Sequence, residues 1–318
     1  MSVSGILNLN KPVDCTSFDL VRRVKRLTRV KKVGHGGTLD PLASGVLPIC
    51  LGRATRVSEF LAESSKTYRA VVAFGAATDT YDAEGTVTEE INASHLTRET
   101  VEEALGPFRG IIMQEPPMYS ALKHEGKRLY ELAREGITVE RPKRETAVHK
   151  LEIVSWDPPQ ATIYVDCGRG TYVRSLAHDI GRELGVGGHL TELARLRTGP
   201  FDIQDSVTPE EFEEAVNGGA WQDLLFPMDL AMSSMPAAIL DRKAERAALN
   251  GQPIPVSYLD YDRITTAAAQ LSSAFREPDE LILCRAYSLD GRFLAVISAP
   301  TPKGPWNPKR VFAPQDGG

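Results

Sequence analysis

Hydrophobic positions recur at helical spacing near the start of the chain, directly after a Thr-Ser pair suited to cap a helix. Leu20, Val24 and Leu27 lie on one stripe, and this pattern predicts a helix. Residues 66–75 (KTYRAVVAFG) are rich in β-branched and aromatic side chains and predict a strand, and residues 77–87 predict a turn followed by a second strand. The N-terminal part of the chain therefore mixes helices with strands.

Three later segments predict helices that end at a glycine: RETVEEALG after Thr97, GKRLYELAREG, and TYVRSLAHDIGRELG. The last of these follows ATIYVDCGRG, a strand pattern that ends in a Gly-Arg-Gly turn. Tyr172 and Arg174 therefore fall at a helix N-terminus just past a strand end, which is a common place for functional side chains.

Two stretches, the acidic PEEFEEAV and the proline-bearing LLFPMDLAMSSMPAA, separate residues 1–234 from residues 235–318. The first part predicts one large domain. The second part contains two strand patterns around an Asp290-Gly291 turn signal and predicts a small β-rich domain. Within the large domain, residues 115–145 are polar, rich in cations and broken by prolines, which is typical of a surface lobe.

The net charge of −5 hides an asymmetry along the chain. Residues 1–200 carry 27 Lys and Arg against 25 Asp and Glu, whereas residues 201–318 carry 10 against 17. Within the predicted first helix the cations oppose the apolar stripe, so this helix face is either simply solvated or binds phosphate. The run is VRRVKRLTRVKK, with no acid among its cations Arg22, Arg23, Lys25, Arg26, Arg29, Lys31 and Lys32.

The sequence shows no feature of an exported or membrane protein. Its four cysteines have no CxxC or other paired spacing, which argues against a disulfide framework and against a zinc site. The N-terminus has no basic start followed by an apolar run, and no segment approaches 18 uninterrupted apolar residues. We expect a cytoplasmic protein that does not cross a membrane.

One carboxylate, Asp40, stands between a glycine run and a proline in VGHGGTLDPLASGVLPICLGRATR, residues 33–56. A lone acid in a stiff loop suits a nucleophile or a base, because glycosidases ordinarily use two carboxylates and two-metal nucleases several. The alternative is a turn cap before Pro41, which is the more common role for such an aspartate. The glycines match neither G-x-G-x-x-G nor the P-loop, which excludes a phosphate-cradling NTPase.

Six segments resemble, in order, the motifs of the TruB family of pseudouridine synthases, and together they span nearly all of residues 5–201. The resemblance implies an α+β catalytic fold with a mixed, mainly antiparallel sheet, followed by a small C-terminal β-rich domain. It also implies an activity, the isomerisation of uridine 55 in the T arm of tRNA to pseudouridine. The segments are GILNLNKPVDCTS, VGHGGTLDPLASGVLPICLGRATR, KTYRA, EPPMYSALKHEGKRLYELAREG, CGRGTYVRSLAHDIGRELG and HLTELARLRTGPF.

By this resemblance Asp40 is the catalytic nucleophile. The reaction breaks the N1–C1′ bond of the uridine and rejoins the base through C5, so it implies no cofactor and no metal. The acids Asp79, Asp82 and Glu84 also lack the spacing of a calcium-binding loop. Three routes stay open for Asp40: addition to C1′, addition to C6 of the base, or abstraction of the 2′ proton to give a glycal, which we favour. Each route needs an ionised acid close to the ribose, in a site closed to bulk water.

Four further residues match family positions that surround the reacting base. Tyr68 matches the tyrosine that stacks on the base and accepts the C5 proton, although a strand tyrosine is more often a packing residue. Arg174 matches the arginine that pairs with the nucleophile, which would keep Asp40 ionised and oriented. Tyr172 matches the aromatic that lines the uracil pocket, and Leu193 matches an apolar residue beneath the base.

The remaining matches concern the RNA and the loop of the nucleophile. His35 matches the histidine that fills the space left by the extruded base, although a lone histidine more often serves packing. Lys11 and Pro12 match a first motif that supports the loop of Asp40. Residues 115–145 match an insertion that grips RNA, and five of its cations are expected to contact phosphate: Lys123, Lys127, Arg128, Lys143 and Arg144.

The chain departs from the family pattern in two places. Asp14 occupies a position of the first motif that is usually glycine, which predicts a reshaped turn. The C-terminal domain resembles the RNA-binding PUA module only in ALNGQPIPV and in the stretch from DGRFLAV to RVF. We expect a PUA-like domain that contacts the acceptor end of tRNA, although its acidic balance argues against strong phosphate binding.

The expected partner is the T arm of tRNA, bound by a monomer without a guide RNA. The insertion favours a stand-alone enzyme, and no apolar seam indicates an oligomer. Two alternatives stay open, a guide-RNA-dependent synthase of the same superfamily and an RNA-binding or RNA-folding chaperone that needs no catalysis. The joint presence of Asp40, Tyr68, Tyr172 and Arg174 argues against a purely binding role.

Overall fold

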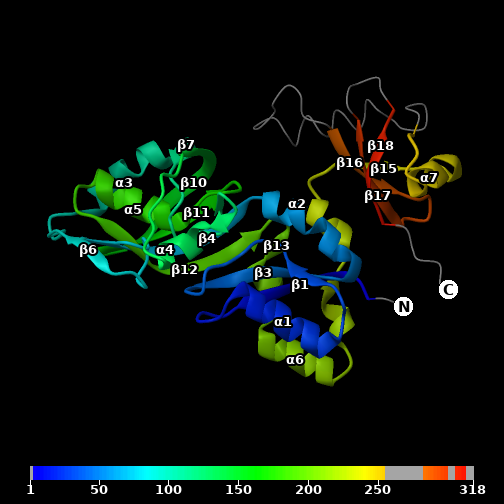
Figure 1. The fold of residues 1–318 in the computed structure, drawn as a ribbon, viewed down its shortest axis with the longest axis horizontal. Coiled ribbons are helices and arrows are strands. Elements are labelled where there is room, and N and C mark those ends of the chain that lie inside the picture. The colour runs from blue at the N-terminus through cyan, green and yellow to red at the C-terminus, as the bar shows by residue number, and fades with distance from the viewer. Residues whose placement is uncertain (1–2, 255–281, 300–304, 313–318) are drawn as a thin grey trace.

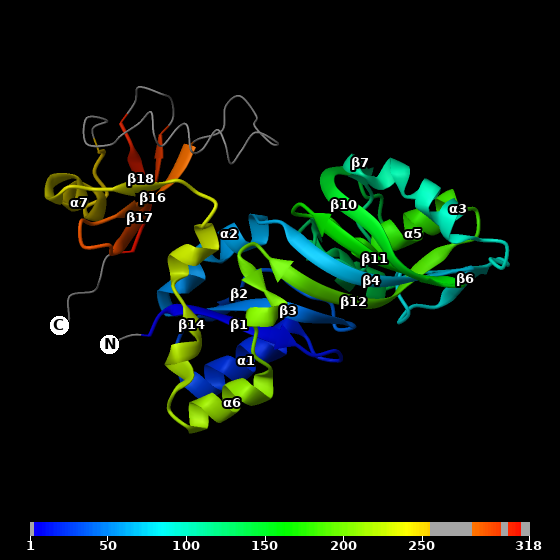
Figure 2. The same ribbon diagram turned by 180° about the vertical axis from the view of Figure 1, so that it is seen from behind.

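The computed structural model describes residues 3–254, 282–299 and 305–312. A ten-stranded sheet runs through most of this structure (Figures 1 and 2). Its neighbouring strands are antiparallel except for β3 and β12, which run parallel near the middle, so the expected mixed, mainly antiparallel sheet is confirmed. The strand order is β14 (Leu225–Phe226), β1 (Gly5–Lys11), β3 (Ala43–Leu51), β12 (Gly188–Thr198), β4 (Lys66–Phe74), β11 (Gln160–Cys167), β10 (Arg144–Asp157) and β7 (Gly110–Gln114), with β2 (Val33–His35) beside β3 and β13 (Phe201–Asp202) beside β12.

Helices and three smaller sheets accompany the large sheet. The α-helices are α1 (Ser17–Thr28), α2 (Ser58–Glu63), α3 (Arg98–Ala104), α4 (Leu129–Arg134), α5 (Val173–Glu183), α6 (Pro209–Asn217) and α7 (Arg242–Leu249). Short 3-10 helices are η1 (Gly52–Val57), η2 (Gly106–Phe108), η3 (Ile203–Asp205), η4 (Trp221–Leu224) and η5 (Met228–Met232). The smaller sheets are β5 (Ala76–Thr78) with β6 (Val87–Glu90), β8 (Lys123–His124) with β9 (Lys127–Arg128), and β15 (Ala237–Ile239) with β16 (Ile282–Tyr287), β17 (Phe293–Ala299) and β18 (Asn307–Val311).

The first helix, α1, begins where the sequence predicts it. The hydroxyl of Thr16 accepts from the backbone N–H of Asp19, and the Asp19 carboxylate accepts from the backbone N–H of Thr16 in return. This reciprocal cap satisfies N–H groups that the first helical turn leaves unpaired. Leu20 and Val24 face the core and are buried, and α6 lies beside α1 in both views (Figures 1 and 2).

Two cations of the basic run on α1 have acid partners. Arg23 forms ion pairs with Glu210 at 2.8 Å and with Glu213 at 2.6 Å, both on α6, and Arg22 pairs with Asp19. Although the run itself contains no acid, these two of its seven cations are therefore neutralised by acids from outside it. One partner lies in the first turn of the same helix, and the other two come from a helix far along the chain that folding brings alongside.

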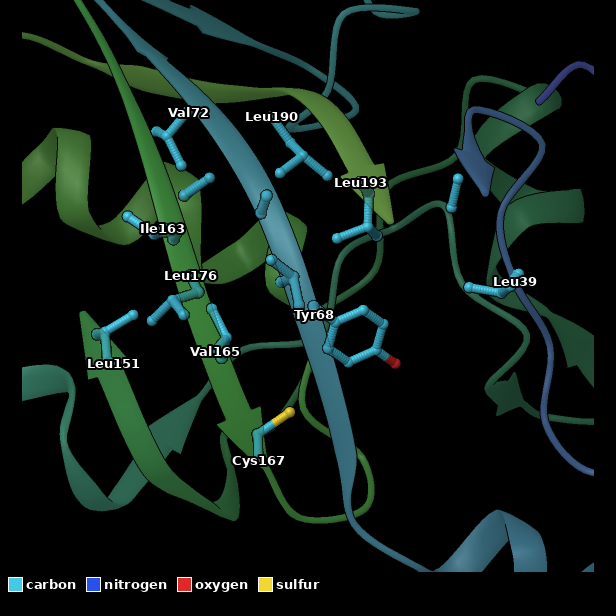
Figure 3. Close-up of a cluster of buried hydrophobic side chains, with 14 of the residues drawn as sticks. Leu39, Tyr68, Val72, Leu151, Ile163, Val165, Cys167, Leu176, Leu190 and Leu193 are labelled. Carbon is cyan, nitrogen blue, oxygen red and sulfur yellow. The ribbon is translucent and has the colours of Figure 1, made fainter. Parts of the chain in front are cut away.

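The main hydrophobic core fills the space between the large sheet and the helices packed on it. Figure 3 shows part of this core, with Val72 on β4, Ile163 on β11 and Leu176 on α5. Helix α5 approaches the start of β12 so closely that a Cβ atom on Gly181 would lie 2.2 Å from the backbone nitrogen of Gly188. Only glycine fits at this crossing, which fixes the height of α5 above the sheet.

Several other predicted elements are present. Thr97 caps α3 as expected, α4 covers six residues of the longer helix predicted there, and Tyr172 is the N-cap residue of α5. Strands β16 and β17 pair around the predicted turn, in which Gly291 has φ of 81°. No helix in the described part of the chain has both the length and the apolar character that a membrane span requires.

The C-terminal sheet packs directly on the N-terminal part of the protein. One hydrophobic cluster contains Ile6 and Val46 from β1 and β3 together with Val296 and Phe312 from the C-terminal part. The predicted boundary after residue 234 falls between η5 and β15. The last two residues of ALNGQPIPV lie outside the described residues, and the PUA-like character of this domain stays a prediction.

Replacement of Gly181 by alanine is expected to lower the free energy of unfolding by about 2–3 kcal/mol, because the new methyl group meets backbone atoms that have no room to shift. Thermal unfolding measures this loss. Gly218→Ala is the matched control, since its Cβ atom would lie 3.5 Å or more from the nearest backbone oxygens and its φ of −80° suits any residue. Equal melting temperatures for the two variants would contradict the close approach of α5 to β12.

Candidate active site

A cavity of about 960 Å³ lies between the loop of Asp40, the turn that joins β5 to β6, and the inserted residues 115–145. It lies beside the middle of the large sheet, where the Asp40 loop enters β3 alongside β12. Of the predicted site residues, His35, Asp40, Arg128 and Arg174 line this cavity.

The Asp40 carboxylate forms an ion pair with the guanidinium of Arg174. The distance from Arg174 Nε to Asp40 Oδ2 is 2.9 Å. The Arg174 side chain is 6% exposed, whereas that of Asp40 is 36% exposed. The carboxylate can therefore meet a substrate in the cavity while its cationic partner stays fixed behind it.

A second carboxylate, Asp82, also pairs with Arg174 and lines the same cavity. The distance from Arg174 Nη1 to Asp82 Oδ2 is 3.3 Å, and the Asp82 side chain is only 4% exposed. Its Oδ1 accepts from the hydroxyl of Thr80 and from the backbone N–H of Glu84, which fixes the carboxylate in its turn. The expectation of a single isolated acid is therefore wrong, because folding brings the turn of Asp82 to the helix of Arg174.

Backbone carbonyl groups complete the surroundings of Arg174. Its Nη1 donates to the carbonyl of Thr80 at 3.3 Å, and its Nη2 donates to the carbonyl of Tyr119 at 2.8 Å. Tyr119 belongs to the inserted segment, and Ser175 next to Arg174 donates to the carbonyl of Glu115 in the same segment. The insertion and the N-terminus of α5 are therefore bonded to each other at the site.

Two buried cations, Arg195 and Lys11, bind the backbone of the loop that carries Asp40. Arg195 on β12 is 1% exposed, and its guanidinium donates to the carbonyls of Gly37, Thr38 and Val46 at 3.1, 3.3 and 2.8 Å. A buried guanidinium needs such partners, because its desolvation is costly. Each bond ties the loop, or the strand that follows it, to the sheet.

Lys11 on β1 is the second of these cations. It is fully buried, and its ammonium group donates to the carbonyls of Pro12 at 2.8 Å and of Pro41 at 3.2 Å. Burial lowers the pKa of Lys11, and the nearby Asp40 charge opposes that shift. The side chain of Lys11 therefore reaches Pro41, the residue that follows Asp40. Lys11 itself does not line the cavity.

The turn at Asp14 keeps a conformation suited to glycine. Asp14 has φ of 60°, in the left-handed region, and its backbone N–H donates to the carbonyl of Pro41 at 3.0 Å. Aspartate tolerates the left-handed conformation better than most residues, and a difference of this turn from that of the family stays a prediction.

Tyr68 and Leu193 lie at the edge of the hydrophobic core rather than on the cavity wall. Both are buried, and Figure 3 shows them on the side of the cluster that faces Leu39, the residue before Asp40. Tyr68 on β4 pairs in register with Arg195 on β12. Burial raises the pKa of the Tyr68 hydroxyl, and the Arg195 charge opposes that shift.

Tyr172 is held through its backbone. The side-chain amide of Gln114 accepts from the N–H of Tyr172 at 2.7 Å and donates to its carbonyl at 3.0 Å. Gln114 thus replaces a side-chain cap at the start of α5, which Tyr172 itself does not supply. Burial raises the pKa of the Tyr172 hydroxyl. Its ring is not on the cavity wall.

His35 lies at the end of β2 and is half-buried at the cavity. Its Nδ1 atom accepts from the backbone N–H of Gly37 at 3.3 Å. Burial lowers the pKa of His35, and the charge of Arg195 lowers it further. The imidazole is therefore stabilised in its neutral form.

Of the five cations predicted to contact phosphate in the inserted residues, only Arg128 lines the cavity. Arg128 lines the cavity and lies over the ring of Tyr130 at 6.0 Å, while Lys127 pairs with Glu135 at 3.3 Å. Lys123, Lys143 and Arg144 are exposed, and no ion pair joins them to another described residue. No group of three or more His, Cys, Asp or Glu suited to a metal occurs in the described ranges.

Sequence patterns missed Asp82, Arg195 and Gln114. Asp82 sits in a polar turn whose spacing indicates no metal loop, and Arg195 lies in HLTELARLRTGPF two positions after Leu193. Arg195 lies two positions after the buried Leu193 on the same strand, so both side chains point to the same side of the sheet. This spacing was the signal available for Arg195, because a charge on the buried side needs internal partners. Nothing in the sequence indicates the partner of Gln114.

Arg195→Met is expected to raise the pKa of His35 toward its ordinary value of 6.5, because only burial would then hold this pKa down. An NMR titration of the His35 ring protons measures the change. Arg197→Met is the matched control, since Arg197 lies two residues further on β12 and pairs with Asp166. The same His35 pKa in both variants would mean that the Arg195 charge does not reach this ring.

Comparisons with known proteins identify the family of the chain. The family described as "TruB family pseudouridylate synthase (N terminal domain)" matches residues 25–173, and "tRNA pseudouridylate synthase B C-terminal domain" matches residues 174–233. The tRNA pseudouridine synthase B of Dehalococcoides mccartyi (strain CBDB1) is 40% identical over 313 residues, 98% of each chain. That of Symbiobacterium thermophilum is 49% identical over 252 residues, 78% of this chain and 82% of the relative.

Solved structures show the same fold. The chain aligns with a Cbf5–Nop10–Gar1 complex at a TM-score of 0.75 and 26% identity, covering 98% of this chain and 86% of the other. It aligns with an archaeal box H/ACA sRNP Nop10–Cbf5 complex at a TM-score of 0.70 and 26% identity, covering 98% and 87%. The chain belongs to the TruB family of pseudouridylate synthases.

Proposed function

We propose that this enzyme isomerises uridine 55 in the T arm of tRNA to pseudouridine, with Asp40 as the nucleophile. The ion pair between Asp40 and Arg174 on the wall of the cavity carries this proposal. Relatives named tRNA pseudouridine synthase B, 40% identical over nearly the whole chain, support tRNA as the substrate. Uridine isomerisation breaks one glycosidic bond and forms one C–C bond within the same nucleotide, so a single reactive carboxylate suffices.

Asp40 has the position that this chemistry needs. Its side chain is the more exposed partner of the ion pair, and Arg174 fixes one of its two oxygens. The other oxygen is the one available to the ribose or the base. Because Arg174 is 6% exposed and also bonds to Asp82 and to two backbone carbonyls, the guanidinium keeps its orientation when substrate enters.

The base must leave the RNA stack to reach Asp40. We assign to His35 the filling of the space that the base leaves, since this neutral ring lies on the cavity wall between glycines. Tyr68 and Leu193 lie behind Leu39, so we propose that the uracil displaces Leu39 before it stacks on Tyr68. Tyr172 would line the far side of the uracil.

The inserted residues supply the predicted contacts to phosphate. Arg128 faces the cavity, and Lys123, Lys143 and Arg144 are exposed without an ion pair among the described residues. Exposed cations without an ion pair lose little free energy when they bind phosphate, because they give up no internal partner. A contact of the C-terminal domain with the acceptor end stays a prediction.

We also propose that the enzyme acts as a monomer without a guide RNA. The relatives named for tRNA are 40–49% identical, whereas the chains solved in guide-RNA particles are 26% identical or less. Purified protein and an unmodified tRNA transcript, with no other RNA, test this point. Activity that appears only after another RNA is added would favour the guide-dependent alternative.

Asp40→Asn is expected to abolish pseudouridine formation, with a rate at least about 10³-fold lower, because an amide is a far weaker nucleophile and base than a carboxylate. Release of label from tRNA carrying 5-³H-uridine measures the rate. Asp223→Asn, an exposed aspartate on η4, is the matched control and should keep the wild-type rate.

Equal pseudouridine yields from Asp40→Asn and wild type would contradict the role of Asp40 as the nucleophile. The same variant separates catalysis from RNA folding. If Asp40→Asn still accelerates refolding of a misfolded tRNA, a chaperone activity exists beside the isomerisation. An inactive wild type that refolds tRNA would instead support the chaperone alternative.

Asp82→Asn is expected to lower kcat by about 10- to 100-fold with little change in KM, because Arg174 loses a charged partner and orients Asp40 less well. Single-turnover rates on tRNA transcript measure this effect. Asp166→Asn is the matched control, since it breaks an Asp–Arg pair with Arg197 that is not at the cavity. A kcat for Asp82→Asn equal to that of the control would rule out this support of Arg174.

A further inference from the structure

Helix α1 starts at the cavity and leads away from it. Thr16, Ser17 and Phe18 at its N-terminus line the same cavity as Asp40. Its buried side packs on the core and on α6, which leaves the opposite side open to solvent. This open side, from here on the outer face of α1, carries Phe18, Arg22, Lys25, Arg26 and Arg29.

Three cations of the outer face have no acid partner among the described residues, in contrast to Arg23, which lies on the side of α1 that meets α6. Arg23 on that side is neutralised by Glu210 and Glu213. Within the described ranges, no carboxylate pairs with Lys25, Arg26 or Arg29. Three like charges within five positions of one helix repel one another, so an anion that binds there relieves this repulsion.

Phe18 adds an aromatic surface at the edge of the cavity. Its side chain is 62% exposed, and the Arg22 guanidinium lies over its ring at 5.5 Å. Arg22 in turn pairs with Asp19, so the stacked pair has a fixed orientation. An exposed phenylalanine that contributes little to the core offers a flat surface on which a base or a ribose packs.

We propose that the outer face of α1 binds the sugar–phosphate backbone of the substrate RNA next to the target nucleotide. Phe18 packs against a base or ribose at the edge of the cavity, and Arg22, Lys25, Arg26 and Arg29 contact successive phosphates. The helix rises about 1.5 Å per residue, so this face extends about 16 Å beyond the cavity. The inference rests on the proposed function, which places RNA in the cavity.

Charge and position favour RNA over a protein partner. The outer face consists of four cations and one aromatic ring, which is the composition of surfaces that bind nucleic-acid backbones. It is also continuous with the cavity that holds the target uridine. A strand that leaves the cavity along α1 passes Phe18 first and then meets positive charge from Arg22 to Arg29.

The test compares two double variants that each remove one lysine and one arginine. Lys25→Gln with Arg26→Gln alters the outer face of α1. Arg69→Gln with Lys150→Gln is the matched control, because both residues are exposed on strands whose register places them on the sheet face opposite Tyr68. Steady-state kinetics with tRNA transcript are measured for both at several KCl concentrations, and melting temperatures verify folding.

The variant on α1 is expected to raise KM about tenfold near 0.1 M salt and to leave kcat unchanged. The dependence of log(kcat/KM) on log[KCl] should become less steep by about two, because each phosphate that the variant no longer binds removes about one from the slope. The control should keep the wild-type slope. A wild-type slope and KM in the α1 variant, or a fall in kcat instead, would overturn the inference.

Phe18→Ala tests the stacking contact separately. It should raise KM about fivefold to tenfold without changing the salt slope, and Phe18→Trp should restore the wild-type KM, because base–aromatic stacking contributes about 1–3 kcal/mol. If wild-type protein forms no pseudouridine, the proposed function fails. Binding of a T-arm hairpin to wild type and to the same four variants, followed by fluorescence anisotropy, still decides whether α1 contacts RNA.

Discussion

A buried guanidinium between two carboxylates is the interaction on which the site depends. Arg174 pairs with Asp40 and with Asp82, both of which line the cavity, and its Nη1 and Nη2 also donate to the carbonyls of Thr80 and Tyr119. A charge in this position is costly unless every partner is in place. The close packing of Gly181 on β12 and the bonds of Gln114 to α5 are therefore part of the same requirement, since they set where the helix of Arg174 begins.

The loop of Asp40 is positioned by the same physical means. Arg195 and Lys11 are buried cations whose donors meet carbonyl oxygens of this loop and of its flanks. Because these bonds are made to carbonyl groups, they fix the backbone of the loop. The position of the Asp40 carboxylate is therefore set by the sheet that carries the two cations. Lys11 on β1 and Arg195 on β12 both pair in register with Gly45 on β3, so the two strands that flank β3 support the loop at the point where it enters the sheet.

Local patterns predicted those elements whose causes are local. The cap and apolar stripe of α1, the strand around Tyr68 and the turn at Gly291 depend on neighbours in sequence, and all three are confirmed. The family resemblance, not spacing, singled out Asp40 and Arg174. The role of Asp82 has no local signal, because its contact with Arg174 joins residues 92 positions apart. The acids of α6 that neutralise Arg23 were hidden for the same reason.

Asp14 shows what a glycine in a motif stands for. The position demands a left-handed backbone, with φ of 60°, and an N–H aimed at the carbonyl of Pro41. Aspartate meets both demands at a modest conformational cost. At this position a residue with a side chain therefore holds the backbone conformation that glycine adopts most easily, beside the loop that carries Asp40.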